Sequence, residues 1–453
     1  MGIGALSSAM SGMKGAQRRL DLASHNIANA QTPGYQKQVL EQRAVGFDAV
    51  PGVFSNTATD PGGMLVTGVA RRSDPGLYSR VIQSQGDAGA TSASAQQLRK
   101  LESVFPEPSE NAIGGQFAEF WATWQGVSNQ PSSMAARTAL LAQTQSLINT
   151  IKTTSNDIAT LRTNATEDLD VMITQVNQMA QELATTASAA RAGDPSLSAT
   201  QDLLSHRDDL AANLASKVGG RVNILKDGTF QFILGGRPLV DGPSVRALQY
   251  TAGSVSWAAD GAPVEVGGEA SGLQTAIGST YDSYSQSLDD VVAALVADVN
   301  SLHSTAYDLA GVTGVDFFDP AGVTAATLSL DAAVAGQPEN IAAAAASGAV
   351  EDGDIARQIA AISISTSGAD SKYRDLIAQL GVDTKLAGGR ESAQATLAES
   401  LDASLKEVSG VNIDEETVDI MAAQRAFQAS ARVITAVDEM LQTLIERTGL
   451  VGR

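Results

Sequence analysis

Both ends of the chain carry a seven-residue repeat of apolar side chains, and this pattern most constrains the fold. Residues 4–29 and a stretch within residues 409–453 each predict one helix with a continuous apolar stripe. Such a stripe needs a partner helix along its length. The layout therefore favours a subunit that joins other subunits over one built around a catalytic pocket. The N-terminal seam is Leu6, Met13, Leu20 and Ile27, and the C-terminal seam is Ile413, Ile420, Phe427, Ile434, Val437, Leu441 and Leu444.

A turn is expected directly after the first helix. Pro33 lacks an amide hydrogen and disfavours helical backbone at the residue before it. Pro33 and Gly34 fit the central positions of a type II turn, where the second residue takes a positive φ. The chain should then be extended from residue 35 to residue 43. The turn motif is made up of Asn26, Asn29, Thr32, Pro33, Gly34 and Tyr35.

The start of the last helix is also marked in the sequence. Gly410 should end the preceding helix, Asn412 can cap the next one, and Glu415 can close a capping box. The two ends differ slightly in charge, because residues 1–50 carry five basic and three acidic groups while residues 409–453 carry four and seven. This difference slightly favours pairing between the two terminal helices.

The middle of the chain predicts further long helices. Residues 132–192 contain neither Gly nor Pro, and their apolar residues step by four and three with one local stutter. As one helix this segment would be roughly 90 Å long, and residues 197–218 should form its returning partner. Residues 96–105, 113–127, 288–303, 340–347, 355–364 and 391–408 also favour helix, whereas residues 50–95 read as irregular and extended.

A second pattern predicts a small β element. Residues 222–226 and 229–234 flank Asp227 and Gly228, a pair suited to a tight hairpin turn. Residues 248–250 and 255–257 form a weaker second pair, so residues 220–275 should be β-rich. Residues 310–338 favour short strands or turns. An aromatic cluster at helical spacing favours a core anchor, with an aromatic ligand platform as the alternative: Phe117, Phe120, Trp121 and Trp124.

Together these patterns predict a mainly α fold with β insertions. It would be an elongated coiled-coil helical rod, formed by both chain ends and long central helices, with a small β-rich outer domain. We expect a terminal coiled-coil domain from residues 1–35 with 409–453. A helical rod domain would comprise residues 36–219 with 340–408, and residues 220–339 would form the outer region with one helix.

Composition narrows the possible partners. The net charge is −20, which argues against nucleic acid and anionic membrane surfaces as partners. No run of about 18 apolar residues is present, so we expect no membrane insertion. The first 30 residues lack a continuous apolar segment, so no ordinary cleaved signal peptide is expected. The chain has no cysteine, which excludes disulfides and thiolate metal sites.

The motifs at the two ends resemble those of the axial proteins of the bacterial flagellum. Asn26-Ile-Ala-Asn29 with Thr32-Pro-Gly-Tyr35 is similar to a motif shared by rod, hook and first hook-associated proteins. Residues 409–416 and 424–431 resemble the hook-associated protein 1 family more closely. Interior stretches also resemble that family, in order along the chain: Trp124-Gln125, Ala135-Ala-Arg137, Asp202-Leu-Leu204, Arg207-Asp208, Leu239-Val-Asp-Gly242, Val299-Asn300 and Phe317-Phe318.

The resemblance implies a structural role at the distal end of the hook. The subunit would form a ring with copies of itself and would contact hook protein on one side and the second junction protein on the other. It would be extracellular, exported through the flagellar apparatus without a cleaved signal peptide, after a cytoplasmic export chaperone had masked its C-terminal helix. Another flagellar axial protein (hook, rod or second junction protein) is the alternative.

Two alternative functions from other classes of protein are an enzyme and a generic coiled-coil scaffold. The three histidines, His25, His206 and His303, lack metal-ligand spacing. Adjacent acidic pairs on helices diverge by about 100° and so do not converge on a substrate. The glycine pairs lack the lysine of a phosphate-binding loop. We therefore predict no enzyme activity, no metal and no cofactor. A generic scaffold would leave the Thr32–Tyr35 turn unexplained.

Overall fold

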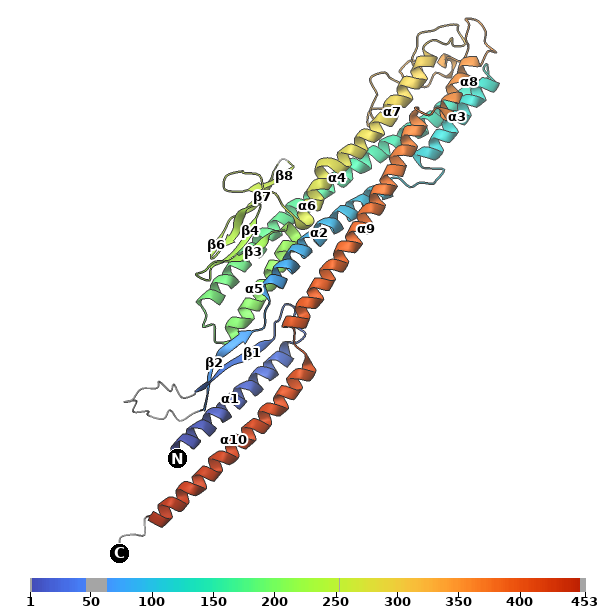
Figure 1. Ribbon diagram of the computed structural model, residues 1–453. Coiled ribbons are helices and arrows are strands. Elements are labelled where there is room, and N and C mark those ends of the chain that lie inside the picture. The colour runs from blue at the N-terminus through green and yellow to red at the C-terminus, as the bar shows by residue number, and fades with distance from the viewer. Residues whose placement is uncertain (1, 46–62, 252, 449–453) are drawn as a thin grey trace.

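The protein is an elongated rod whose two ends of chain lie at the same pole (Figure 1). The computed structural model describes residues 2–45, 63–251 and 253–448, with side chains for residues 4–446 of these ranges. Helices dominate, and the strands form small sheets on one flank. This arrangement confirms the predicted fold class of a helical rod with a small β-rich part.

The lower part of the rod is a pair of terminal helices. Helix α1 (Gly2–Asn29) and helix α10 (Ile413–Thr448) lie side by side (Figure 1). Asn412 caps α10 as predicted, because its Oδ1 accepts from the amide of Asp414 at 2.9 Å. Glu415, predicted to close a capping box, instead accepts a hydrogen bond from Lys37 at 3.2 Å.

An antiparallel ribbon covers another side of α1. Strand β1 (Gln38–Val45) pairs with β2 (Gly63–Arg71), with a bulge between Glu41 and Gln42. The ribbon approaches α1 closely, since a Cβ at Gly15 would collide with the end of Met64. The prediction of extended chain after the turn is confirmed. Of the segment predicted as irregular, residues 50–62 lie outside the described residues.

Long helices make up the body of the rod (Figure 1). Helix α4 (Met134–Ala192) folds back onto α5 (Ser198–Val218), as the sequence predicts. Its predicted stripe is buried, with Leu140, Leu147 and Ile151 inaccessible to solvent. Helix α2 (Pro75–Val104) packs on α5 and on α9 (Ala369–Ser409), which runs from the upper part of the rod down to α10.

The prediction of irregular structure was wrong for residues 75–95, which belong to α2. Its small residues mark tight helix packing and not a loop. A Cβ at Gly89 would collide with the carbonyl of Ser216 on α5, and Gly86 lies close to the carbonyl of Ala215. Asp74 starts the helix by accepting from the amide of Leu77, and Pro75 follows in its first turn.

The predicted hairpin forms within a four-stranded antiparallel meander. Strands β3 (Arg221–Ile224) and β4 (Phe230–Leu234) are joined through Gly228, whose φ is 82°. Strands β5 (Arg237–Asp241) and β6 (Ser244–Val245) complete the sheet, and β7 (Leu248–Thr251) pairs separately with β8 (Ser254–Trp257). The β-rich prediction was wrong for residues 268–275, which form α6 (Gly268–Thr275) against α2 and α5.

The upper end of the rod holds α3 (Ile113–Asn129), α7 (Tyr281–His303) and α8 (Asp354–Ala360). A π-helical segment, Ala276–Thr280, joins α6 to α7, and short 3-10 turns lie at Pro338–Asn340 and Ala361–Ile364. The aromatic cluster is the core anchor that the sequence predicts. Its four side chains are buried beside Phe317 and Phe318: Phe117, Phe120, Trp121 and Trp124.

Two helix predictions in this part were inaccurate. Residues 340–347 are largely non-helical because tertiary contacts take up their backbone groups. The amide of Ala342 donates to His303 Nε2 at 2.8 Å, and Ala344 bridges to Tyr307. Helix α9 begins at residue 369 and not at residue 391, although it contains Gly381, Gly388 and Gly389.

Candidate assembly interface

The terminal pair meets along a line of small side chains. Ala9, Ala16 and Ala23 of α1 are buried, and Ala423 and Val437 of α10 lie among the buried residues of the pair. A Cβ at Gly12 would sit 3.1 Å from Ser430 Oγ, which shows how closely the helices approach. The seam is therefore narrow.

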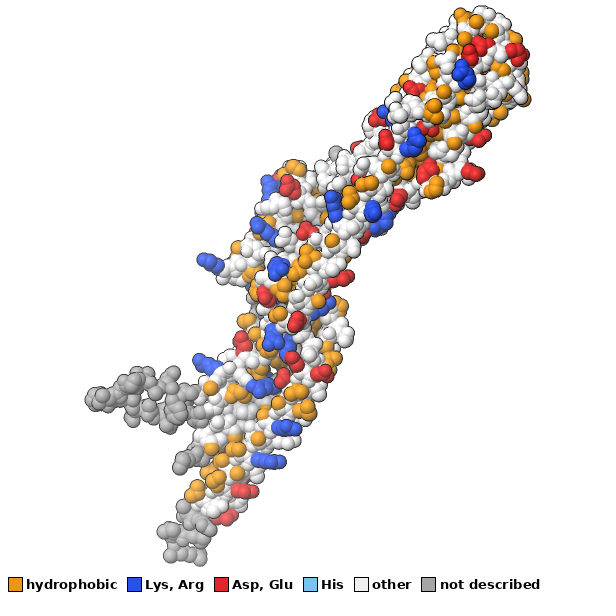
Figure 2. Space-filling model, turned by 45° about the vertical axis from the view of Figure 1, so that its right-hand side comes forward, with side chains coloured by type: hydrophobic (Ala, Val, Ile, Leu, Met, Phe, Trp, Pro, Cys, Tyr) orange, Lys and Arg blue, Asp and Glu red, His pale blue; other side chains and the backbone are white. Residues whose placement is uncertain are grey.

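The larger predicted seam residues flank this line and remain partly open to solvent. Leu6, Met13, Leu20 and Ile27 are all half-buried. On α10, Val437 is buried and three members are half-buried, while the others are exposed: Ile413 by 47%, Phe427 by 38% and Leu444 by 58%. Figure 2 shows hydrophobic side chains at the surface of this slender part of the molecule. One partner helix thus covers only part of the apolar surface.

The turn motif has the predicted conformation. The amide of Tyr35 donates to the carbonyl of Thr32 at 3.2 Å, and Gly34 has a φ of 73°. A Cβ at Gly34 would also lie 2.6 Å from the Cβ of Asp209 on α5. Glycine is therefore required there both by the backbone and by the close approach. Thr32 and Pro33 are exposed, and Asn29 donates to the carbonyl of His25 within the helix.

Asn26 lies at the centre of a buried polar cluster, which we define as Asn26, Tyr35, Lys37, Gln38 and Glu416. Its Nδ2 donates to the carbonyl of Gln38 at 2.9 Å and to Glu416 Oε2 at 3.1 Å. Its Oδ1 accepts from the amide of Gln38 at 3.1 Å and from the Tyr35 hydroxyl at 2.8 Å. One side chain thus joins α1, the turn, β1 and α10.

An ion pair lies within this polar cluster. Lys37 Nζ is 2.7 Å from Glu416 Oε1 and 3.2 Å from Glu415 Oε2, and the Glu416 side chain is 2% exposed. Burial disfavours the Lys37 ammonium, but hydrogen bonds and charge from Glu416 and Glu415 outweigh it and raise the pKa of Lys37. Burial, with Asp202 and Glu416 nearby, raises the pKa of Tyr35.

The polar cluster also connects the terminal pair to the body. Gln38 Nε2 donates to Asp202 Oδ1 of α5 at 2.7 Å, and His25 lies 3.3 Å from the same carboxylate. The amide of Lys37 donates to the carbonyl of Ser409 at the end of α9 at 2.7 Å. These contacts fix the direction in which α1 and α10 leave the body.

Sequence reasoning missed most of the polar cluster. It identified Asn26 and Tyr35 but assigned no role to Lys37, Gln38 or Asp202. Glu416 was likewise not predicted as part of the cluster. The adjacent Glu415 and Glu416 were the available signal, because an acidic pair at a buried helix start needs a cation. Nothing in the sequence shows which of the 30 basic residues supplies it.

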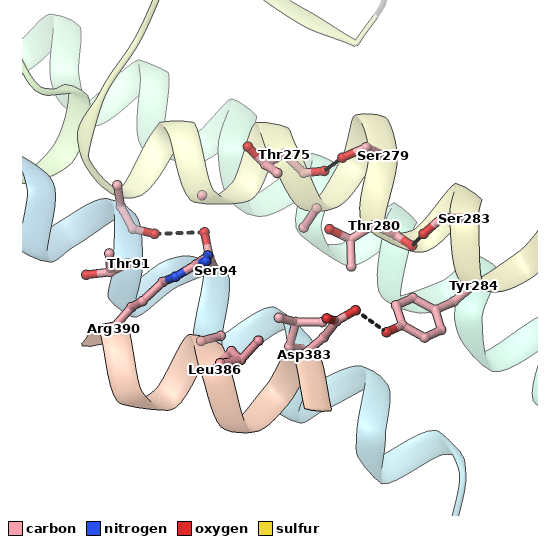
Figure 3. Close-up of a pocket in the computed structure, with 15 residues that line it drawn as sticks. Thr91, Ser94, Thr275, Ser279, Thr280, Ser283, Tyr284, Asp383, Leu386 and Arg390 are labelled. Atoms are coloured by element: carbon pink, nitrogen blue, oxygen red, sulfur yellow. Dashed lines mark hydrogen bonds between the residues drawn. The ribbon is translucent and has the colours of Figure 1, made fainter. Parts of the chain in front are cut away.

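A cavity of about 490 Å³ lies between α2, the α6–α7 segment and α9 (Figure 3). Several of its polar groups are engaged with one another or with their own helices. Tyr284 donates to Asp383 Oδ2 at 2.8 Å, and the hydroxyls of Ser94, Thr275 and Ser279 each donate to a carbonyl of their own helix. These groups do not form a nucleophile paired with a base.

Among the residues that the structure describes, no three His, Asp or Glu side chains are placed to hold a metal ion. None of the helices in the described ranges combines the length and the apolar character needed to cross a membrane.

Family models match three segments of the chain. Residues 98–318 match the flagellar hook-associated protein FlgK helical domain. Residues 6–36 match the flagella basal body rod protein model, and residues 404–447 match the flagellar basal body rod FlgEFG protein C-terminal model. The two terminal matches cover the parts of α1 and α10 that hold the turn motif and the seams.

Curated relatives are similar along most or all of the chain. Flagellar hook-associated protein 1 of Bacillus subtilis (strain 168) is 24% identical, and the alignment covers 99% of both chains. The protein of the same name from Salmonella typhimurium is 26% identical over 69% of this chain and 59% of its own length. The Escherichia coli (strain K12) relative is 24% identical over the same shares.

A solved structure has a similar fold. The flagellar hook junction protein FlgK from Burkholderia pseudomallei aligns with a TM-score of 0.64 at 13% identity, covering 73% of this chain and all of that chain.

Proposed function

We infer that this chain belongs to the flagellar hook-associated protein 1 family. It is therefore a structural subunit of the bacterial flagellum at the junction between hook and filament. Similarity to a relative of that name over 99% of the chain carries this conclusion. The match of residues 98–318 to the helical domain of the same family supports it. Both findings favour this function over another axial protein such as hook, rod or second junction protein.

We propose that the terminal pair is the part that assembles. The observation that carries this is the incomplete coverage of the seams, since Phe427 and Leu444 remain exposed although α1 lies alongside. Exposed apolar surface of this kind marks a site for a further partner. The polar cluster supports the same role, because it fixes α1 and α10 to the body and so presents both helices in a defined direction. We also propose the domain division expected from the sequence: residues 1–35 with 409–453, residues 36–219 with 340–408, and residues 220–339.

The particular partners are also proposed. Copies of the same chain would complete a ring, with hook protein on one side and the second junction protein on the other. A cytoplasmic chaperone would cover the exposed residues of α10 before export, which would proceed without a cleaved signal peptide. The role is structural, without catalysis or cofactor. The Figure 3 cavity supports this, because the hydroxyls of Ser94, Thr275 and Ser279 donate to carbonyls of their own helices.

Deleting the gene and examining the cells by electron microscopy tests the function. Completed hooks without filaments, with filament protein released into the medium, are expected. Re-expression of this chain should restore filaments. Absent hooks would assign the chain to hook or rod instead, and normal filaments would overturn the junction role.

A further inference from the structure

A groove runs between α1 and β2, on a different side of α1 from α10. It has a volume of about 650 Å³, and we call it the α1–β2 groove. Three apolar side chains that line it are open to solvent: Met10 is 43% exposed, Leu65 is 45% exposed and Leu197 is 50% exposed. The groove thus offers an apolar surface that this copy of the chain leaves uncovered.

The α1–β2 groove is also basic. Lys14 and Arg18 line it one helical turn apart, and both are exposed. Across the described ranges neither takes part in an ion pair. Two such cations are notable in a chain whose net charge is −20. The groove therefore suits an occupant that carries both apolar and acidic side chains.

Helix α10 carries a second heptad stripe with that character. Each member directly precedes a buried or half-buried residue or, for Ala426, the seam residue Phe427, so the stripe is rotated by about 100° from the α1 contact. All its members are exposed. The stripe begins with the acidic residues Glu415 and Asp419 and continues with small and apolar ones at steps of three and four: Ala422, Ala426, Ala429, Val433, Ala436 and Met440. A heptad stripe with slim side chains is suited to close packing against another element.

We propose that the α1–β2 groove of one copy receives the second stripe of α10 from a second copy. Complementary charge argues for this occupant, because α10 holds seven acidic side chains and three arginines while the groove presents Lys14 and Arg18. The order along the helices also fits. Since α1 and α10 run antiparallel (Figure 1), a neighbour of the same orientation that places Asp419 opposite Arg18 brings Ala426 level with Met10, because the members of each pair are about two helical turns apart.

This contact uses two different surfaces of the molecule. Each copy has one groove and one second stripe, and α1 separates them, so the association is head to tail. A head-to-tail contact closes into a ring or continues as a helix, depending on the rotation between copies. The inference rests on the proposed junction role and specifies the surfaces through which neighbouring copies meet.

Cysteine cross-linking tests the proposal cleanly, because the chain has no cysteine of its own. Met10→Cys would be combined in turn with cysteine at each apolar position of the second stripe, in cells that make only the variant. Flagella isolated from swimming cells would be oxidised and separated without reductant. We expect at least one pair to give a ladder of dimers and larger multimers of this chain.

Exposed positions outside the two surfaces supply matched controls. Arg19→Cys, on the opposite face of α1 from Met10, replaces the groove cysteine, and Gln428→Cys replaces the stripe cysteine; neither residue lines the groove or belongs to the stripe. No ladder is expected from them. Three results would each overturn the inference. They are no ladder from swimming cells with any groove–stripe pair, equal ladders with the controls, and a cross-link to a different protein. The junction role would still stand, because the variants assemble.

A charge exchange gives a second readout. Arg18→Glu or Asp419→Arg alone should lower the yield of the multimer ladder by about two- to fivefold, and the double variant should recover it. Equal loss in the double and the single variants would contradict direct pairing of these two side chains. Circular dichroism of each purified full-length variant verifies that the helices are retained.

Discussion

Asn26 illustrates why a single residue type can be required at one position. Its amide uses both donors and both acceptor positions, on Gln38, Glu416 and Tyr35. Aspartate would lose the two donors and place a second carboxylate beside Glu416. Glutamine would be one methylene too long for a position that is 1% exposed. The identity of this residue is thus set by hydrogen bonding and not by helix propensity.

Replacing Lys37 should lower the free energy of unfolding more than replacing Glu416. Lys37→Met leaves the buried Glu416 carboxylate without a cation and should lower the free energy of unfolding by about 3 kcal/mol. Glu416→Gln should cost less, because Lys37 keeps Glu415 at 3.2 Å. Urea unfolding, followed by circular dichroism, measures both. Lys406→Met, which breaks an exposed pair with Asp402, serves as the control and should stay within about 0.5 kcal/mol of the parent.

His303 should make the upper end of the rod sensitive to acid. Burial lowers the pKa of His303 to about 4, from a usual value of 6.5. Its Nδ1 donates to Val315 and its Nε2 accepts from Ala342, an arrangement that needs the neutral ring. Between pH 6.5 and 4 the unfolded chain therefore binds the extra proton, and the free energy of unfolding should fall by about 3 kcal/mol as the pH is lowered.

The test compares the pH dependence of urea unfolding for the parent and for His303→Gln. For the variant, the free energy of unfolding should lack the decrease between pH 6.5 and pH 4 that His303 causes, whatever the variant's stability at neutral pH. Parallel curves for the two proteins would show that His303 does not contribute.

At the scale of helices and strands, the elements with an uninterrupted period could be predicted from the sequence. Helix α4 has neither Gly nor Pro, and the β3–β4 hairpin has Asp227-Gly228 at its turn. Residues 75–95 of helix α2 and the first half of α9 were not predicted as helix, because their glycines resemble loop signals. In α2 the close approach of Gly86 and Gly89 to α5 explains these glycines. The helix prediction for residues 340–347 was wrong for a different reason, because hydrogen bonds to distant residues override a composition that favours helix.

The turn motif could likewise be predicted, since it depends on local spacing. The polar cluster could not, because Lys37 and Glu416 are 379 positions apart in the chain and only the packing of α1 against α10 and β1 brings them together. The α1–β2 groove also requires the three-dimensional structure, as it combines α1, β2 and the start of α5.

A charge in the α10 seam should block assembly and leave the body folded. Ile434→Asp places a carboxylate at a half-buried seam position. The variant should be made and should keep the circular dichroism of the parent, but it should be absent from isolated flagella by immunoblot. Gln428→Asp, on an exposed face of the same helix, should assemble normally. Incorporation of Ile434→Asp at the parental level would contradict the assembly role of the seam.

At the scale of the whole molecule, stability is distributed unevenly along the rod. The body has a continuous core running from Leu101 through α4 to Leu380, whereas the terminal pair relies on a narrow alanine seam. Two helices with a narrow contact are only marginally stable by themselves. The ends are therefore expected to gain stability when neighbouring subunits cover them.

Hydrogen exchange followed by mass spectrometry should reveal this difference in the free monomer. Residues 1–30 and 415–453 should exchange fast, and α4 should be the most protected helix. In assembled flagella the same terminal peptides should become protected. Strong protection of both ends in the monomer would mean that the pair is stable without neighbours.

The position of both chain ends at one pole has a practical consequence for imaging. A fluorescent or affinity tag fused to either terminus would be placed beside the terminal pair, where bulk interferes with subunit contacts. The β3–β4 hairpin projects from the flank, well away from that pole (Figure 1). Asp227 and Gly228 at its tip are exposed, and a Cβ at Gly228 would meet no atom within 4 Å. A short internal epitope inserted there should label the protein in working flagella, because exposed hairpin tips tolerate insertions.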